Sequence, residues 1–249
     1  MSGDSAPFQL GPGDLFATTR WTVIVTARGR HTPAAERALQ ELCSAYWYPL
    51  YAYVRRQGHG REDAEDLTQA FFARMLAGRD LDRLDSEKGR FRAFLLAAMK
   101  HFLANEWDKV RAQKRGGGAV HLPLDWHEAD ARYGITSADE SSPDRIYDRA
   151  WAVTLLERVI GKLRRECEAE GRVETFDVLR DFLMLQKEAI PYAQAGEQLG
   201  LTPGAVRVAV HRLRKRYREL LREEISQTVS DTGQIEEEMR ALFQAFAAS

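Results

Sequence analysis

The sequence predicts an all-α protein with two helical domains joined by an acidic flexible linker. Apolar residues recur at helical spacing along most of the chain, and no long stretch alternates apolar and polar residues as a β-strand would. The second domain contains two helical patterns on either side of a glycine, which predicts a helix-turn-helix. We expect an N-terminal extension at 1–32, a first domain at 33–118, the linker at 119–146, a second domain at 147–225 and a C-terminal helical tail at 226–249.

The composition indicates an ordinary intracellular protein. The chain has 249 residues, of which 44% are hydrophobic and 29% charged, and its formal net charge is −1. Cys43 and Cys167 are far apart and lack the spacing of metal ligands, so neither a disulfide framework nor a zinc site is expected. No basic and apolar leader opens the chain, and no apolar run approaches the ~18 residues of a membrane span. We therefore expect a cytoplasmic protein without membrane attachment, metal ion or cofactor.

Three long helical patterns fill the first domain, at 33–57, 61–77 and 91–115. Pro49 lies inside the first pattern and should kink or break that helix, because proline cannot donate the backbone hydrogen bond. The second pattern opens with acidic residues, which favour a helix N-terminus. The third ends in a mixture of basic and aromatic residues before Gly116, where we expect the helix to stop.

The region between the two domains is acidic. Residues 119–149 contain seven acids against three bases and a Ser-Ser-Pro run, which predicts a linker. Two further helices are expected at 147–170 and 173–186. A last pattern at 233–246 carries an apolar stripe that is too wide to leave in water. We expect this tail to pack on the second domain, either on its apolar side or on its basic face, where it would be autoinhibitory.

The helix-turn-helix is predicted at 188–222, where two helical patterns are separated by a short turn. Gly200 follows the first pattern, and a glycine can end a helix by entering the left-handed region. Thr202 offers a hydroxyl N-cap to the second helix. Pro203 then occupies its first position, where the missing N–H costs nothing.

The second helix of this pair has an apolar face and a basic face. Val206, Val210, Leu213, Tyr217 and Leu220 form the apolar stripe. A solvated helix face usually mixes charges of both signs, and here Glu219 is the only acid between Pro203 and Arg222. Such a helix fits the major groove of DNA as a recognition helix. The residues expected to contact DNA are Thr202, Arg207, His211, Arg212, Arg214, Lys215 and Arg218.

Three segments resemble motifs of one protein family, in that family's order. Residues 63–72 read DAEDLTQAFF, residues 90–115 begin with RFRAFL and contain NEWD, and residues 192–218 contain the helix-turn-helix. Together they resemble the extracytoplasmic-function (ECF) sigma factors of bacterial RNA polymerase, over roughly 35–115 and 147–224. Three motifs in the right order are fairly specific, whereas any one of them alone would be weak.

The resemblance implies a role for each segment. The first would bind the clamp helices of the large subunit of core RNA polymerase, the second would read and melt the minus-10 element, and the third would read the minus-35 element of promoter DNA. The residues implied for polymerase binding are Asp63, Asp66, Gln69 and Phe72. Those implied for the minus-10 element are Lys100, His101, Asn105, Trp107, Lys109 and Arg111. The protein would then direct promoter-specific transcription initiation.

Some positions depart from the family pattern or suggest regulation. Ala70 stands where the family usually has a carboxylate, which would weaken the polymerase contact, and Val208 leaves the recognition helix with fewer polar groups. Because some family members are switched on by a Ser/Thr kinase that acts on this helix, Thr68 is a candidate phosphorylation site. An anti-sigma factor is a further candidate partner. The acidic linker resembles the segment that threads the polymerase's active cleft, with a solvated tether as the alternative.

Two other functions compete with the sigma factor. A stand-alone helix-turn-helix transcriptional regulator would explain the second domain but not the 63–72 and 90–115 segments. An enzyme with a metal site at Glu62, Asp63, Glu65 and Asp66 would need further ligands, and no other residues have the spacing to supply them. Acids in a first helical turn are common for dipole reasons alone. We therefore expect no catalytic residue.

Overall fold

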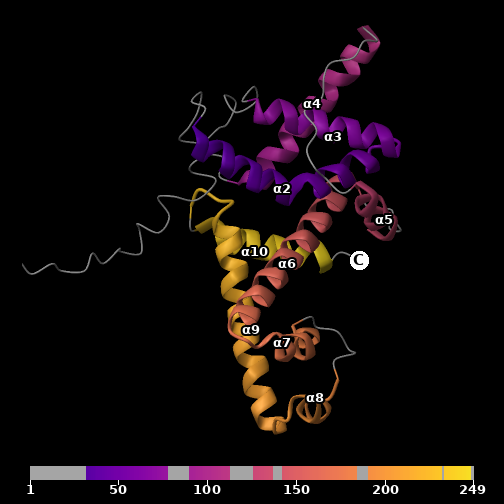
Figure 1. Ribbon diagram of the computed structural model, residues 1–249. Coiled ribbons are helices and arrows are strands. Elements are labelled where there is room, and N and C mark those ends of the chain that lie inside the picture. Colours follow the sequence, from indigo (N-terminus) through magenta and orange to yellow (C-terminus); the bar gives the residue numbers. More distant parts are fainter. Residues whose placement is uncertain are drawn as a thin grey trace, which may run out of the picture. The chain divides into compact units, whose positions relative to one another are not determined.

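The computed structural model describes residues 32–77, 90–112, 126–136, 142–183, 190–231 and 233–247. Every regular element within these ranges is a helix, apart from one isolated β-bridge, which confirms the all-α prediction (Figure 1). Contacts between Cα atoms divide the chain into a first unit, Met1–Trp151 with Ile225–Ser249, and a second unit, Ala152–Glu224. The C-terminal tail thus belongs to the unit that contains the N-terminal helices, which differs from the domain order expected from the sequence.

Helices α2 (Pro33–Arg56), α3 (Arg61–Leu76) and α4 (Phe91–Ala112) form the core of the first unit. The predicted helices lie within a few residues of these bounds, and α2 continues through Pro49 without ending there. Aromatic side chains join α4 to the other two helices: ring centroids lie 5.7 Å apart for Phe71 and Phe102 and 5.2 Å apart for Tyr46 and Phe91. The largest fully buried side chains of these helices include Tyr51, Tyr53, Phe71, Phe72, Phe91 and Met75.

Helix α5 (Trp126–Thr136) lies inside the predicted flexible linker and packs on α2. The indole of Trp126 meets that of Trp47 edge-to-face, with ring centroids 5.4 Å apart. Asp130 pairs with Arg55 and accepts a hydrogen bond of 3.0 Å from the Tyr51 hydroxyl. The prediction of a flexible linker is therefore wrong for these eleven residues, because the acids and aromatics of the linker find partners on α2.

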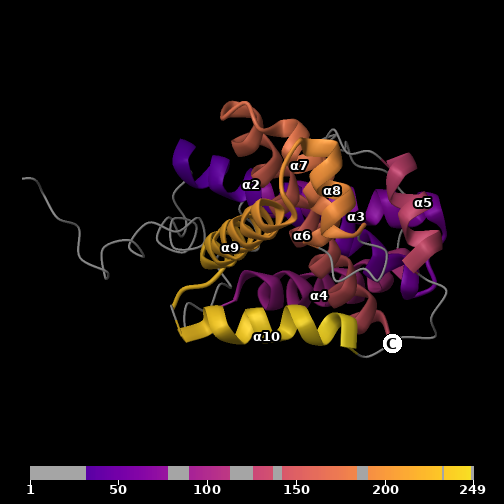
Figure 2. The ribbon, with the colours of Figure 1, turned by 90° about the horizontal axis from the view of Figure 1, so that it is seen from below.

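Helix α10 (Gly233–Ala247) belongs to the first unit, and its Glu238 contacts Arg92 near the start of α4; both helices are labelled in Figure 2. The stretch before α10 forms an antiparallel bridge between Val229 and Arg90 at the start of α4. The tail helix was predicted, but on the second domain; it packs on the first unit instead. Its carboxylates Glu237 and Glu238 pair with arginines of the first unit, which no sequence pattern connected to the tail.

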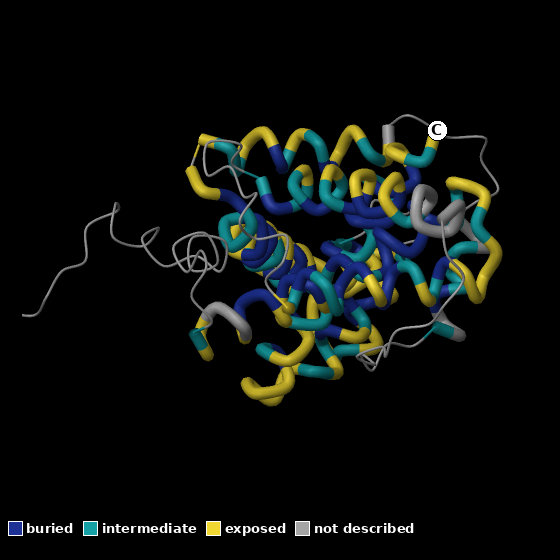
Figure 3. Tube along the Cα trace, turned by 90° about the horizontal axis from the view of Figure 1, so that it is seen from above, coloured by how far each residue is buried: buried dark blue, intermediate teal, exposed yellow. Residues whose placement is uncertain are grey.

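The second unit contains the segment that was predicted to form a helix-turn-helix. Its elements are the end of α6 (Pro143–Ala169), α7 (Val173–Leu179), a short 3-10 helix η4 (Arg180–Phe182), α8 (Tyr192–Leu199) and most of α9 (Pro203–Ser226). Both α6 and α9 continue into the first unit. Figure 3 shows that burial changes from residue to residue along the helices, as expected for amphipathic helices.

Candidate nucleic-acid and polymerase-binding surfaces

The turn between α8 and α9 is tight because two glycines allow it. Gly200 has a φ of 64°, in the left-handed region, and ends α8 as predicted. The backbone of Leu201 then approaches Gly196: its N–H donates to the Gly196 carbonyl at 2.9 Å. A Cβ atom at Gly196 would lie only 2.5 Å from the Leu201 carbonyl oxygen. Thr202 caps α9 by accepting a hydrogen bond of 3.2 Å from the Ala205 N–H.

Helix α9 buries its predicted apolar stripe and exposes bases on its other sides. Val206 and Val210 are buried, as are Leu213 and Leu220. The exposed side chains of the helix include Arg207, Val208, His211, Arg212, Lys215 and Arg218. Val208 is 50% exposed, so the outward face is not purely basic. A helix held from behind by an apolar stripe, with cations in front, has the arrangement of a major-groove reader.

The side chains of Phe182, Tyr192 and Arg207 stack and connect three elements of the second unit. The rings of Phe182 in η4 and Tyr192 in α8 lie nearly parallel, with centroids 5.1 Å apart. The guanidinium carbon of Arg207 lies 5.9 Å from the centre of the Tyr192 ring. This cation–π contact restrains the first base of α9 beside the turn. No sequence pattern pointed to Phe182, since it lies outside both predicted helices of the helix-turn-helix.

Arg214 was expected to contact bases but binds the protein itself. Its Nε and Nη2 donate to the backbone carbonyl of Phe182 at 2.9 and 2.7 Å. The guanidinium therefore anchors η4 to α9, and two of its donors are already used. The sequence did not indicate this contact, because Arg214 shares a helical spacing with Arg207 and Arg218 and could not be separated from them.

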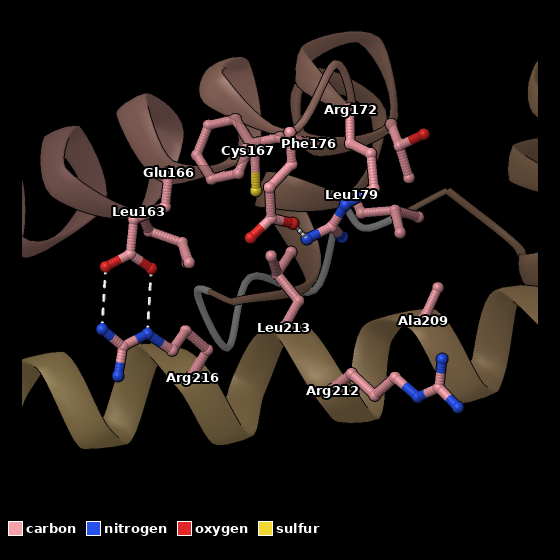
Figure 4. A pocket seen from close by; sticks show the side chains of 12 residues that line it. Leu163, Glu166, Cys167, Arg172, Phe176, Leu179, Ala209, Arg212, Leu213 and Arg216 are labelled. Carbon is pink, nitrogen blue, oxygen red and sulfur yellow. Dashed lines mark hydrogen bonds and ion pairs between the residues drawn. The ribbon is translucent and has the colours of Figure 1, made fainter.

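A groove of about 470 Å³ lies between α9 and the helices α6 and α7 (Figure 4). Leu163, Phe176 and Leu213 line its apolar part. At one side Arg216 makes two parallel hydrogen bonds of 2.9 and 2.7 Å to the carboxylate of Glu166, drawn as dashed lines in Figure 4. The hydrogen bonds from Arg216 lower the pKa of Glu166 below its ordinary value. Arg216 thus stabilises the packing of α9 on α6 and is only partly exposed to solvent.

In the first unit, the residues expected at the minus-10 element lie in the second half of α4. Lys100, His101 and Asn105 are exposed. The ammonium group of Lys100 pairs with Asp144 of α6 at 2.7 Å, and this hydrogen bond raises the pKa of Lys100. The backbones of Trp107, Lys109 and Arg111 also belong to α4, but their side chains lie outside the described part of the structure.

A small hollow of about 280 Å³ adjoins these α4 residues. Tyr53, Gln57 and His59 line it from α2 and the turn after it, and Lys100 and Leu103 from α4. The Gln57 amide donates to the Tyr53 hydroxyl at 2.8 Å, which fixes both polar groups at its edge. The hollow therefore brings a phenol, an amide, an imidazole and an ammonium group together, none of which was connected by the sequence pattern.

Helix α3 exposes only part of the set expected to bind polymerase. Asp63 and Asp66 are exposed, as predicted. Gln69 and Phe72, however, are 7% and 0% exposed and belong to the core of the unit. The expected exposed row of Asp63, Asp66 and Gln69 therefore ends after Asp66, because the apolar side of α3 is wider than its sequence suggested.

Comparison with known proteins assigns the chain to a family. A family model described as Sigma-70 region 2 matches residues 42–114. The ECF RNA polymerase sigma factor ShbA of Streptomyces griseus subsp. griseus is 32% identical over 166 residues, which cover 67% of this chain and 75% of that protein. The chain belongs to the ECF sigma factor family. No solved structure matches it.

Membership of this family decides between the functions left open by the sequence. Sigma factors direct promoter-specific transcription initiation by RNA polymerase, and this function applies to the chain. A stand-alone regulator is not favoured, and the family consists of transcription regulators that are not enzymes. The described residues contain no group of three or more His, Cys, Asp or Glu side chains placed to hold a metal ion. Among them, no helix is long and apolar enough to cross a membrane.

The candidate phosphorylation site of this sigma factor does not have the environment expected for it. Thr68 is 0% exposed, and its hydroxyl has no hydrogen-bond partner among the residues that the structure describes. A kinase must reach the hydroxyl it modifies, so the expectation of a surface threonine on α3 is wrong. The helical spacing misled because Thr68 shares the helix face of the buried Ala64 and Phe72.

Proposed function

We propose that this sigma factor divides promoter recognition between its two units. Helix α9 reads the minus-35 element in the major groove, and the second half of α4 holds the opened strand of the minus-10 element. Helix α3 binds the clamp helices of the polymerase's large subunit, so the protein acts in the cytoplasm with the polymerase. The observation that carries the proposal is the exposed face of α9, which carries several cations along the helix that follows a capped N-terminus.

On the exposed face of α9, some residues suit contacts that specify the DNA sequence, and others suit contacts that only position the protein. Arg207 lies nearest the turn and can donate to guanine O6 and N7, a pair of contacts that discriminates by ~1–3 kcal/mol. Val208 offers an apolar contact to a thymine methyl group, and His211 lies one turn after Arg207. Lys215 and Arg218 lie further along the helix and suit phosphates, which position the protein without specifying sequence.

The second half of α4 has the residue types that a single strand needs. An opened strand is held by positive charge along its backbone and by surfaces or pockets for unstacked bases. Lys100 supplies positive charge beside the hollow lined by Tyr53, Gln57 and His59, and the exposed His101 follows it on α4. In the free protein Asp144 pairs with Lys100, so an incoming phosphate would replace this carboxylate. The exchange costs little because both partners are about half exposed.

The contact with polymerase is assigned to the exposed acids at the start of α3. Asp63 and Asp66 lie on the outward side of a helix whose other side is fixed by buried Phe71 and Met75. The exposed Ala70 follows them without a carboxylate, so the acidic surface does not continue beyond Asp66 on this side of the helix. Gln69 and Phe72 support the helix from inside the unit.

The experiment is transcription in vitro with purified bacterial core polymerase on a promoter library. We expect initiation that depends on this protein and selects a subset of promoters. Asp66→Arg should abolish association with core polymerase in a pull-down, since it reverses a charge at the centre of the surface. Glu174→Arg is the matched control: it reverses an exposed charge in the second unit and should leave core binding unchanged. Equal core binding by Asp66→Arg and Glu174→Arg would reject the α3 surface.

A further inference from the structure

The stretch just before the C-terminal helix α10 is connected to the start of α4 through backbone contacts. Val229 and Arg90 form an antiparallel bridge, and the Phe91 N–H donates to the Thr228 carbonyl at 3.0 Å. Val229 is 1% exposed, so this bridge belongs to the interior of the first unit. After it leaves the second unit, the chain thus contacts the first unit again at Arg90 and Phe91, where α4 begins.

A buried carboxylate continues the connection. Glu238 of α10 is 1% exposed and receives three hydrogen bonds from two arginines. Arg92 donates from Nε to Oε2 and from Nη2 to Oε1, both at 3.1 Å. Arg90 adds a bond of 3.3 Å to Oε1, and also pairs with Glu237. A carboxylate removed from water needs such bonds, because an unpaired buried charge is very costly.

Arg92 in turn connects three helices. It pairs with Asp148 of α6, and its guanidinium carbon lies 4.3 Å from the centre of the Trp151 ring. Its backbone carbonyl accepts a hydrogen bond of 3.0 Å from the Tyr147 hydroxyl. Burial by itself would lower the pKa of Arg92, but the bonds and charges of Glu238 and Asp148 outweigh it and raise the pKa. Arg92 therefore stays charged and fixes α4 between α6 and α10.

We propose that α10 is a permanent part of the polymerase-binding unit and that Glu238 is a positioning residue for promoter opening. Glu238 acts through Arg92, which sets the direction in which α4 leaves the core. The proposal rests on the assignment of the second half of α4 to the minus-10 strand. Asn105 lies thirteen residues beyond Arg92, about 20 Å along a helix, so a tilt of about 10° at Arg92 moves it by roughly 3 Å.

The opposite role, an autoinhibitory tail that leaves when polymerase or DNA binds, is less consistent with these contacts. Release would break the bridge at Val229 and leave Arg92 buried without its main partner. It would also expose Leu242, which is 1% exposed in the docked helix. An inhibitory tail is better held by exposed ion pairs, which exchange easily with water and phosphate.

The first experiment compares Glu238→Gln with Glu236→Gln in the full-length protein. Both remove one charge from α10, but Glu236 is exposed whereas Glu238 is buried. At a temperature where both variants are folded, we expect Glu238→Gln to lower promoter opening about tenfold, measured by permanganate reactivity at saturating core polymerase. Affinity for core polymerase and for minus-35 duplex should change less than twofold. Loss of the fold alone would reduce all three measurements together.

A conservative variant and a double variant test whether Glu238 acts through Arg92. Glu238→Asp keeps the charge and should recover part of the opening lost in Glu238→Gln. Arg92→Gln combined with Glu238→Gln should open promoters no less than Arg92→Gln alone, because the two residues act as one unit. Full additivity of the two losses would contradict the proposed connection.

The second experiment asks whether the tail stays docked in the working protein. Val229 and Arg90 face each other in an antiparallel bridge, where Cα atoms are typically about 4.5 to 5.5 Å apart, which suits a disulfide. We expect the Arg90→Cys, Val229→Cys protein to transcribe equally well when oxidised and when reduced. The oxidised and the reduced sample are the same variant, so the loss of the Arg90 side chain affects both equally and does not change the comparison. Activity that disappears on oxidation and returns on reduction would overturn the proposal in favour of a tail that must leave.

The outcomes also separate this proposal from the assignment of α4. If Lys100→Ala and Asn105→Ala open promoters normally while Glu238→Gln still lowers the unfolding midpoint, the assignment of α4 fails, and with it the positioning role. The structural role of α10 would survive that result. If Glu238→Gln matches Glu236→Gln in both unfolding midpoint and promoter opening, the proposal for Glu238 fails whatever α4 does.

Discussion

Two arginines of α9 that look alike in the sequence have different surroundings. Arg207 is exposed and touches the protein through the face of Tyr192. Arg214 lies two helical turns later and directs two donors to the Phe182 carbonyl. A cation–π contact at the surface leaves the guanidinium free to bind a base, whereas a double hydrogen bond to a backbone carbonyl uses its donors.

We therefore predict opposite effects for the two substitutions. Arg214→Ala should lower the free energy of unfolding by about 1–3 kcal/mol, as expected for hydrogen bonds to a charged group. Arg207→Ala should leave stability within about 0.5 kcal/mol and should change which minus-35 sequences are preferred. Chemical denaturation and binding to a set of duplexes measure the two quantities. A change of sequence preference in folded Arg214→Ala, with none in Arg207→Ala, would reverse the assignment.

The pair of Glu166 and Arg216 predicts how the second unit responds to acid. Because the folded-state pKa of Glu166 is lowered, the pair contributes stability above the unfolded-state pKa of about 4.3 and loses it as pH falls through the folded value. The contribution is small, about 0.2–1 kcal/mol, since both side chains are more than a third exposed. In Glu166→Gln the difference from wild type in unfolding free energy should shrink below pH 4. A difference that stays constant to pH 3 would contradict it.

At the scale of elements, the turn of the helix-turn-helix depends on two different properties of glycine. Gly200 supplies a positive φ, and Gly196 supplies room for the Leu201 carbonyl. Only the first property was expected, because a glycine at a helix end is a familiar stop signal. The second depends on how closely the chain returns after the turn.

Alanine substitutions at Gly196 and Gly204 should distinguish the effect of lost space at the turn from the effect of alanine on the helix backbone. Gly196→Ala would place Cβ 2.5 Å from a backbone oxygen, so we expect a loss of roughly 1–3 kcal/mol in stability. Gly204→Ala is the control: its Cβ meets nothing closer than the Thr202 hydroxyl at 4.0 Å, and alanine favours the helix. It should be neutral or slightly stabilising in thermal unfolding. Equal unfolding midpoints for the two variants would show that the turn adapts.

Helix α5 gives a second test at this scale. Asp130→Asn removes the charge that Arg55 faces and weakens the bond from Tyr51, so α5 should open more often. We expect amide exchange in 126–136 to quicken about fivefold, equivalent to about 1 kcal/mol, a typical net value for a hydrogen bond. Asp177→Asn, on the second unit, should leave this exchange unchanged. Unaltered exchange in Asp130→Asn would mean that aromatic contacts alone hold α5.

At the scale of the whole molecule, two features are relevant to DNA binding: how charge is distributed along the chain, and how the chain passes between the two units. The net charge is −1, so the cations of α9 are balanced by acids elsewhere in the chain. The second unit is an insertion within the first, since the chain enters it through α6 and leaves it through α9. DNA binding by such a protein depends on local charge and not on the total.

The salt dependence of binding to a minus-35 duplex should reflect how many cations can contact phosphates. Arg207, Arg212, Lys215 and Arg218 are exposed. Arg214 is exposed too, but two of its donors are bonded to the Phe182 carbonyl, and Arg216 is paired with Glu166. About four phosphate contacts predict a slope of log K against log salt of roughly −3 to −4. Lys215→Ala should reduce that slope by about 1 without altering sequence preference. A slope near zero for the full-length protein would contradict the minus-35 assignment.

The sequence by itself determined the features that depend on neighbours within a few residues. The three long helices of the first unit, the stop at Gly200, the cap at Thr202 and most of the apolar stripe of α9 follow from spacings of three to four residues, and these features were predicted correctly. Short-range hydrogen bonds and side-chain spacing decide such features whatever lies beyond them. The family motifs also lie in single continuous segments, so the function could be predicted from them.

Only the tertiary structure decided which residues face outward and which partners they find. Thr68 and Phe72 turned out to be core residues, because α3 is buried on a wider side than its pattern indicated. Arg214 finds a carbonyl 32 residues away, and Arg92 finds Glu238 at a separation of 146 residues. Glu238 on the last helix and Arg92 on α4 are not related by any helical spacing, so no sequence pattern connects them. Contacts of this kind depend on the path of the whole chain, which local spacing does not encode.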